Sequence, residues 1–98
     1  DMYNGRTETV QLRFDGALIN VVMDRFGADA HLRPDGDGGI AVTAPVEVGP
    51  TFFGWLFQLG TKAELVGPEA IRQEFRRCCA NVLAQYESAE SAEKEPRT

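Results

Sequence analysis

The segment 50–60, Pro-Thr-Phe-Phe-Gly-Trp-Leu-Phe-Gln-Leu-Gly, predicts a short helix that is apolar on too many sides for an ordinary surface helix. At about 100° per residue, four apolar side chains share one face: Phe52, Trp55, Leu56 and Leu59. Phe53 and Phe57 widen the apolar arc to roughly 200°, whereas a surface helix needs a stripe of somewhat over ~100°. We therefore expect this helix to pack on a core and to meet another helix, subunit or domain as well.

The chain has 98 residues, enough for one domain, and a formal net charge of −5. This acidic balance argues against direct binding to nucleic acid, which requires clustered Lys and Arg. No apolar run in the sequence approaches the ~18 residues of a membrane span, and its first residues do not have the basic-then-apolar pattern of a signal segment. We expect a cytoplasmic protein without membrane contact. Because the sequence opens with Asp1, we also expect it to be a piece of a longer protein.

Hydrophobic periodicity and turn residues divide the chain into alternating strands and helices. Four strands are predicted over residues 9–14, 31–34, 40–46 and 63–66. A helix with Asp15 as its N-cap follows the first strand and ends at Gly27, and a second helix covers 50–60. A long last helix is predicted from apolar residues at steps of three and four: Ile71, Phe75, Cys78, Cys79, Val82, Leu83 and Tyr86.

This order predicts an α+β fold of the ferredoxin-like βαββαβ type. An antiparallel four-stranded sheet would carry two helices on one face, and right-handed crossovers give the strand order 4-1-3-2. The extra C-terminal helix should lie beside the first two helices or on a partner, because the open face of the sheet is polar. Residues 87–98 are polar and low in complexity, which predicts a disordered tail.

Few residues of the sequence suggest a catalytic, metal-binding or ligand-binding site. His31 is the only histidine, and no arrangement around it suggests a catalytic triad, so we expect no enzyme. We predict no metal and no cofactor, since Cys78 and Cys79 are adjacent and lack the spacing of a zinc site. Adjacent helical positions also point about 100° apart, so these cysteines do not form a disulfide with each other. On the open face, Arg13, His31 and Arg33 could form a small anion-binding patch, the alternative being a solvated surface balanced by acidic neighbours.

Four blocks of sequence occur in a characteristic order: Val10–Phe14, Val22–Gly27, Phe52–Gly60 and Glu64–Glu69. Together they resemble the C-terminal extension module, called WCX, of bacterial WYL-domain transcriptional regulators. The resemblance runs from about Glu8 to Tyr86, and residues 1–7 would be a linker from a missing upstream domain. The Gly54-Trp-Leu56 segment is not the Trp-Tyr-Leu motif that names the WYL domain, so no ligand-binding residue of that domain is carried over.

The resemblance implies a regulatory or oligomerisation role in a transcription factor. Partners would be a second copy of the chain, as a homodimer, and the WYL domain of the same parent chain. DNA would be bound only through the absent helix-turn-helix domain. An effector ligand is possible but not identified by the sequence. The expected contact residues come from the apolar helix and the last helix: Phe53, Trp55, Phe57, Phe75, Cys79 and Val82.

Two other functions are compatible with a ferredoxin-like topology, although fold analogy is weak support for function. The first is a small-molecule-sensing regulatory domain of the ACT type, which would use the patch on the open face. The second is an enzyme of the acylphosphatase kind, which needs an Arg in the loop after the first strand. That loop reads Asp15-Gly16, so the sequence argues against this enzyme.

Overall fold

The computed structural model describes residues 6–94, with side chains described to residue 88. Four strands form one sheet: β1 (Arg6–Asp15), β2 (His31–Asp35), β3 (Gly39–Val48) and β4 (Ala63–Gly67). Three α-helices accompany it: α1 (Ile19–Phe26), α2 (Pro50–Gln58) and α3 (Glu69–Lys94). Short 3-10 helices join these elements: η1 (Gly16–Leu18), η2 (Gly27–Asp29) and η3 (Gly60–Lys62).

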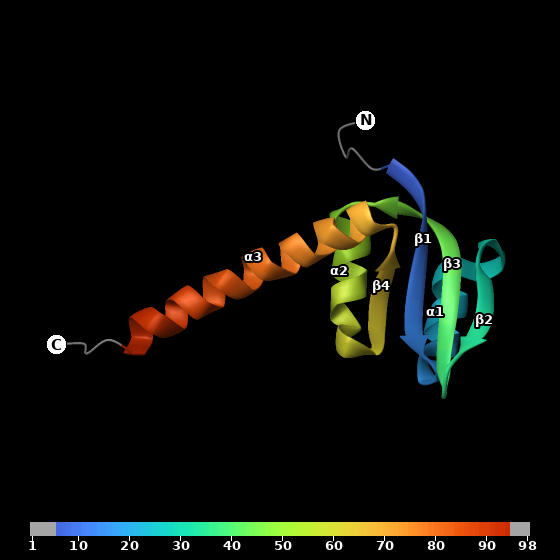
Figure 1. Cartoon of the computed structure of the whole chain (residues 1–98), viewed down its shortest axis with the longest axis horizontal. Coiled ribbons are helices and arrows are strands. Elements are labelled where there is room, and N and C mark those ends of the chain that lie inside the picture. Colours follow the sequence, from blue (N-terminus) through green and yellow to red (C-terminus); the bar gives the residue numbers. More distant parts are fainter. Residues whose placement is uncertain (1–5, 95–98) are drawn as a thin grey trace.

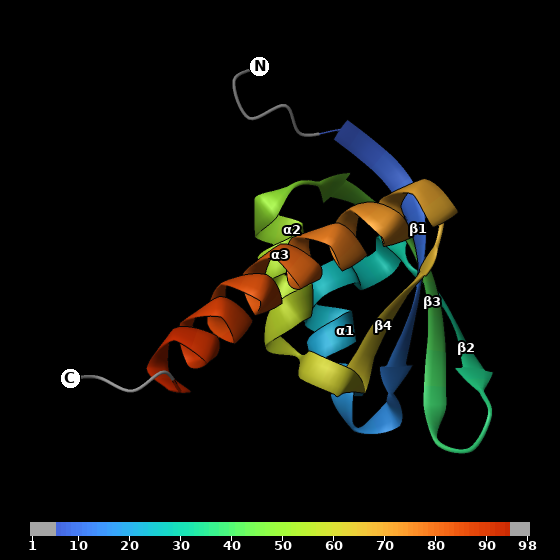
Figure 2. The same cartoon turned by 60° about the vertical axis from the view of Figure 1, so that its left-hand side comes forward.

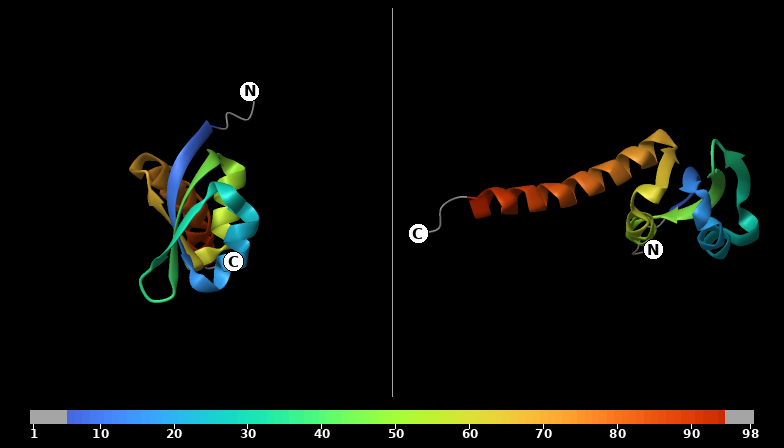
Figure 3. Two further views of the ribbon diagram at one scale, coloured as in Figure 1. Left: turned by 90° about the vertical axis from the view of Figure 1, so that its right-hand side faces the viewer. Right: turned by 90° about the horizontal axis from the view of Figure 1, so that it is seen from below.

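The sheet is antiparallel with the order β2-β3-β1-β4, which confirms the ferredoxin-like prediction and its strand order. The pairing of β1 with β3 is the longest, running from Arg6 opposite Val48 to Asp15 opposite Gly39. The hairpin between β2 and β3 turns at Gly36 and Gly38, both of which have the positive φ angles that glycine adopts readily. Helices α1 and α2 cover one face of this sheet (Figures 1 and 3).

The core lies between that face and the helices. Alternate residues of β1 and β3 point into it, as the period of two in a strand requires. The helices cover the core on its other side with Val22 of α1, Phe52 and Leu56 of α2, and Ile71 of α3. The opposite face carries the exposed residues Gln11 and Arg13. The core is therefore one layer thick, and the helices have an outer side that it does not use.

The boundaries differ from the sequence predictions at three places. Asp15 accepts a hydrogen bond from the Ala17 amide at 2.9 Å and so caps η1, while α1 begins only at Ile19. Strand β1 begins at Arg6, inside the segment predicted as linker; residues 1–5 lie outside the described range. The expectation of disorder from residue 87 onward is corrected over 87–94, where α3 continues as helix, and 95–98 again lie outside the described range.

Helix α3 is the most unusual element. It has 26 residues, about 39 Å at 1.5 Å per residue, and only its first half lies against the rest of the domain. Figures 1 and 2 show the second half projecting away from the sheet and from α2. Every residue from Ala80 to Ser88 is exposed. We call the segment 80–94 of α3 the arm.

Candidate interface groove

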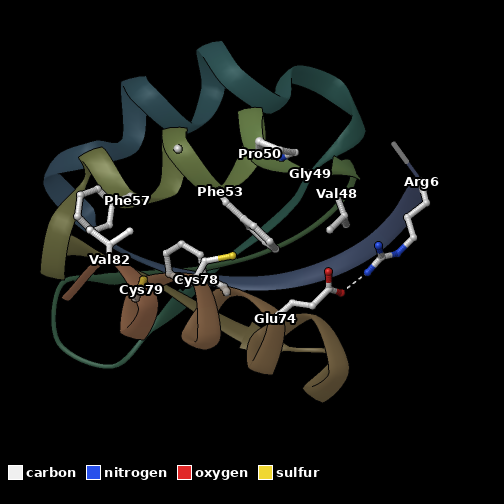
Figure 4. Close-up of a pocket in the computed structure, with 12 residues that line it drawn as sticks. Arg6, Val48, Gly49, Pro50, Phe53, Phe57, Glu74, Cys78, Cys79 and Val82 are labelled. Carbon is white, nitrogen blue, oxygen red and sulfur yellow. Dashed lines mark hydrogen bonds and ion pairs between the residues drawn. The ribbon is translucent and has the colours of Figure 1, made fainter. Parts of the chain in front are cut away.

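A groove opens between α2 and the first half of α3. Helix α2 begins at Pro50, whose missing N–H needs no partner at the first helical position, and this start directs Phe53 and Phe57 toward α3. Helix α3 leaves β4 and contributes Phe75, Cys79 and Val82 from the facing side. The groove has a volume of about 670 Å³, and its lining is mostly apolar (Figure 4).

The floor of the groove is an aromatic contact between the two helices. The rings of Phe53 and Phe75 lie 5.3 Å apart between centroids with an interplanar angle of 50°. Phe53 therefore packs against the last helix, one of the alternatives left open for the apolar helix. Phe57 lies one turn further along α2 at the mouth of the groove, opposite Val82, and 60% of its surface is exposed. The groove is therefore closed at its base and open along one side.

One ion pair marks the polar end of the groove. The Arg6 guanidinium contacts the Glu74 carboxylate, which ties the start of β1 to α3 (Figure 4). Arg6 also lies 3.5 Å from Glu8 on its own strand. Since these side chains are partly exposed, the pair contributes little to stability and mainly fixes the position of the α3 start.

The two cysteines lie on the α3 wall of the groove and are free thiols. Burial first, and then the neighbouring charge of Cys78, raise the pKa of the Cys79 thiol above its ordinary value. A protonated thiol is a poor nucleophile and a poor metal ligand. Cys79 therefore acts here as a small apolar residue of the groove wall.

Five of the six predicted contact residues come together in this groove: Phe53, Phe57, Phe75, Cys79 and Val82. Trp55 does not. Its indole packs inside the domain at 5.6 Å from Phe26 and 6.0 Å from Phe14, and the Arg25 guanidinium lies 5.0 Å above its ring. Trp55 thus holds α2 to α1 and the sheet on the side away from α3.

The sequence-based list omitted three apolar residues of α3 that belong to the same surface. Cys78 lines the groove, and Leu83 and Tyr86 extend the stripe along the arm. The helical periodicity included all three, so the signal was present. The periodicity did not show the residue from which α3 extends beyond the domain.

The residues of the candidate ligand patch lie on the open face of the sheet, but one of them is already in an ion pair. Strand pairing places Arg33, Ala41 and Arg13 in one row across the open face, with His31 beside Thr43 in the next row. The Arg13 guanidinium, however, donates to Asp35 at 2.8 Å and lies 4.0 Å from Glu64. Its charge is already compensated, which weakens the attraction of the row for an anion.

No group of three or more His, Cys, Asp or Glu side chains within the described range is placed to hold a metal ion. Nor is any helix in this range both long enough and apolar enough to cross a membrane. A family model described as the WCX domain matches residues 6–83, which is most of the chain. The comparison with curated proteins gives no match.

Proposed function

Because this chain belongs to the WCX domain family, we propose that it is the C-terminal regulatory and oligomerisation module of a bacterial transcriptional regulator. WCX domains are associated with regulators that contain a WYL domain. In the proposed parent protein, a helix-turn-helix domain binds promoter DNA and a WYL domain lies between it and this module. The module itself is a binding domain and not an enzyme.

The observation that carries this proposal is the open apolar groove with the arm beside it. Phe57 at the mouth of the groove and Tyr86 on the arm are 60% and 66% exposed, and the groove itself is lined by Phe53, Phe75 and Val82. Large apolar side chains gathered around an open groove typically mark an interaction surface. The groove thus supports a role in contact with another domain or chain.

The alternative, a sensor for a small anion on the open face of the sheet, has less support. Arg13 is paired with Asp35, and the other two residues of the patch, His31 and Arg33, are exposed on the strand surface. Ligand sites in proteins are generally concave and combine apolar walls with a few placed polar groups. The groove meets this description better than the open face does.

The proposal is tested in a cell that carries the intact regulator and a reporter gene under its promoter. Phe57→Glu places a charge at the mouth of the groove, where contact with a partner would bury it at high cost. We expect loss of regulation at an unchanged level of the protein. Met23→Glu is the matched control, because Met23 is also an exposed apolar residue but lies on α1, outside the groove.

If the two variants regulate the reporter equally well, the groove has no role in regulation and the proposed function is wrong. If both fail, the measurement of protein level decides whether the cause is loss of folding. Only a selective failure of Phe57→Glu supports the proposal.

A further inference from the structure

We propose that the groove is filled by the arm of a second copy of this chain, with the two α3 helices antiparallel. This inference rests on the proposed oligomerisation role and names its partner and its geometry. Val82 and Tyr86 of each copy would enter the groove between α2 and α3 of the other. The argument uses the burial of the arm, the position of its apolar stripe and the distribution of its charges.

The arm has an apolar side that the described part of its own chain leaves largely uncovered. Val82, Leu83 and Tyr86 are 44%, 56% and 66% exposed. Isolated helices shorter than about 12–15 residues are marginal in water, and most helices are held by packing of an apolar face. A helix that extends this far beyond its domain therefore needs a partner for that face.

The apolar stripe runs without interruption from the groove onto the arm. Phe75, Cys79, Val82 and Tyr86 follow each other at steps of four, three and four residues. At about 100° per residue these four lie within roughly 60° of one another on the helix. Steps of three and four residues are the repeat by which two helices pack along a common seam. The stripe thus fits another helix better than a loop or a sheet.

The charges select the antiparallel direction. Segment 72–77, beside the groove, contains three arginines and one glutamate, whereas segment 87–94, the end of the arm, contains three glutamates and one lysine. In a parallel pair, like charges would face each other at both ends. In an antiparallel pair centred near residue 81, Arg76 of each copy lies beside Glu87 of the other. Both positions fall on the same flank of the stripe, about 20° apart at ~100° per residue.

These charges are available for a partner. Arg76, Arg77 and Glu87 form no ion pair with any residue in the described part of the chain. Arg76 and Glu87 of one copy are about 16 Å apart along α3, too far to pair with each other. The antiparallel arrangement also aligns the two helix dipoles favourably. The family match ends at residue 83 and so does not include the acidic end of the arm.

The first experiment measures mass by light scattering over a dilution series. We expect the chain to be a dimer, with twice the monomer mass of 10.8 kDa, and Val82→Glu to be a monomer with its circular dichroism largely retained. Met23→Glu should remain a dimer, since Met23 lies outside the groove. A wild-type chain that stays at the monomer mass up to ~1 mM would overturn the proposal.

The second experiment tests the direction by exchanging charges. Arg76→Glu and Glu87→Arg should each weaken dimerisation about fivefold or more, because each creates two like-charge contacts per dimer. The double variant restores both contacts in the antiparallel pair and should dimerise within about twofold of wild type. In a parallel pair, where each residue lies level with its own counterpart and Arg76 is far from Glu87, the double variant would be no better than the single ones. That result would overturn the antiparallel geometry.

The two proposals fail in different ways. A chain that is monomeric, combined with loss of regulation in the Phe57→Glu reporter strain, would mean that the groove contacts another domain and not a second copy. The proposed function would then stand and the present inference would fall. A dimeric chain combined with normal regulation in the Phe57→Glu reporter strain would mean that the present inference stands and the proposed function falls.

Discussion

At the scale of single residues, α2 divides its aromatic side chains between two tasks. Trp55 contacts Phe14 and Phe26 and so belongs to the domain, while Phe57 one half-turn later is exposed beside α3. The wide apolar arc of this helix is thus explained by two surfaces on opposite flanks. Edge-to-face contacts such as those of Trp55 add to the effect of apolar burial.

We predict that Trp55→Ala lowers the free energy of unfolding by about 3 kcal/mol, because it removes a large aromatic side chain from three aromatic neighbours. Chemical unfolding of dilute protein should be followed by circular dichroism, since Trp55 is the only tryptophan. Met23→Ala is the control and should change the free energy of unfolding by no more than ~0.5 kcal/mol. A loss below ~1 kcal/mol for Trp55→Ala would show that the indole is not part of the core.

At the scale of elements, Gly54 and Gly60 of the α2 region have opposite roles. Gly54 lies inside the helix, and an added Cβ would meet no heavy atom within 4 Å. Gly60 follows the helix with φ +64°, a conformation that L side chains rarely adopt. The first glycine therefore weakens the helix, and the second allows the chain to turn from α2 into β4.

We predict that Gly54→Ala raises the free energy of unfolding by about 0.5–1 kcal/mol, since alanine has less conformational freedom to lose in the unfolded chain. Gly60→Ala should lower it by about 1–2 kcal/mol through strain at a positive φ. Thermal and chemical unfolding of the two variants under identical conditions provide the measurement. Equal effects of the two changes would contradict this assignment of roles.

The same scale shows how far the sequence determines the fold. Alternation in 40–46 and the glycine-rich turn before Ile40 predicted the hairpin, and the order of the elements combined with right-handed crossovers predicted the strand order. The length of α3 was not predictable in the same way. Residues 87–94 combine Glu, Ala, Ser and Lys, a composition shared by exposed helices and by disordered segments. A helical wheel shows which side chains are apolar but not which of them the rest of the domain covers. Trp55 and Phe57 were therefore both predicted as contact residues.

At the scale of the whole molecule, the arm determines the shape. The radius of gyration is 16.5 Å, whereas a compact domain of this length has about 13 Å. The longest dimension is 59 Å, and Figure 3 shows that α3 accounts for it. An extended shape of this kind fits the proposed assembly, in which the protruding part would become buried.

The last prediction concerns DNA, and it follows from the charge of the whole molecule. Nonspecific binding depends on Lys and Arg that neutralise phosphates and release counterions, and typically has a Kd of ~10⁻⁴–10⁻⁶ M. This chain carries a net charge of −5, and Arg72 on its most basic segment lies 3.5 Å from Glu69. We therefore expect no shift of a random duplex by ~100 µM protein at ~150 mM salt. Micromolar binding would contradict this expectation, and its loss in Arg76→Ala would then show that α3 contacts the phosphates directly.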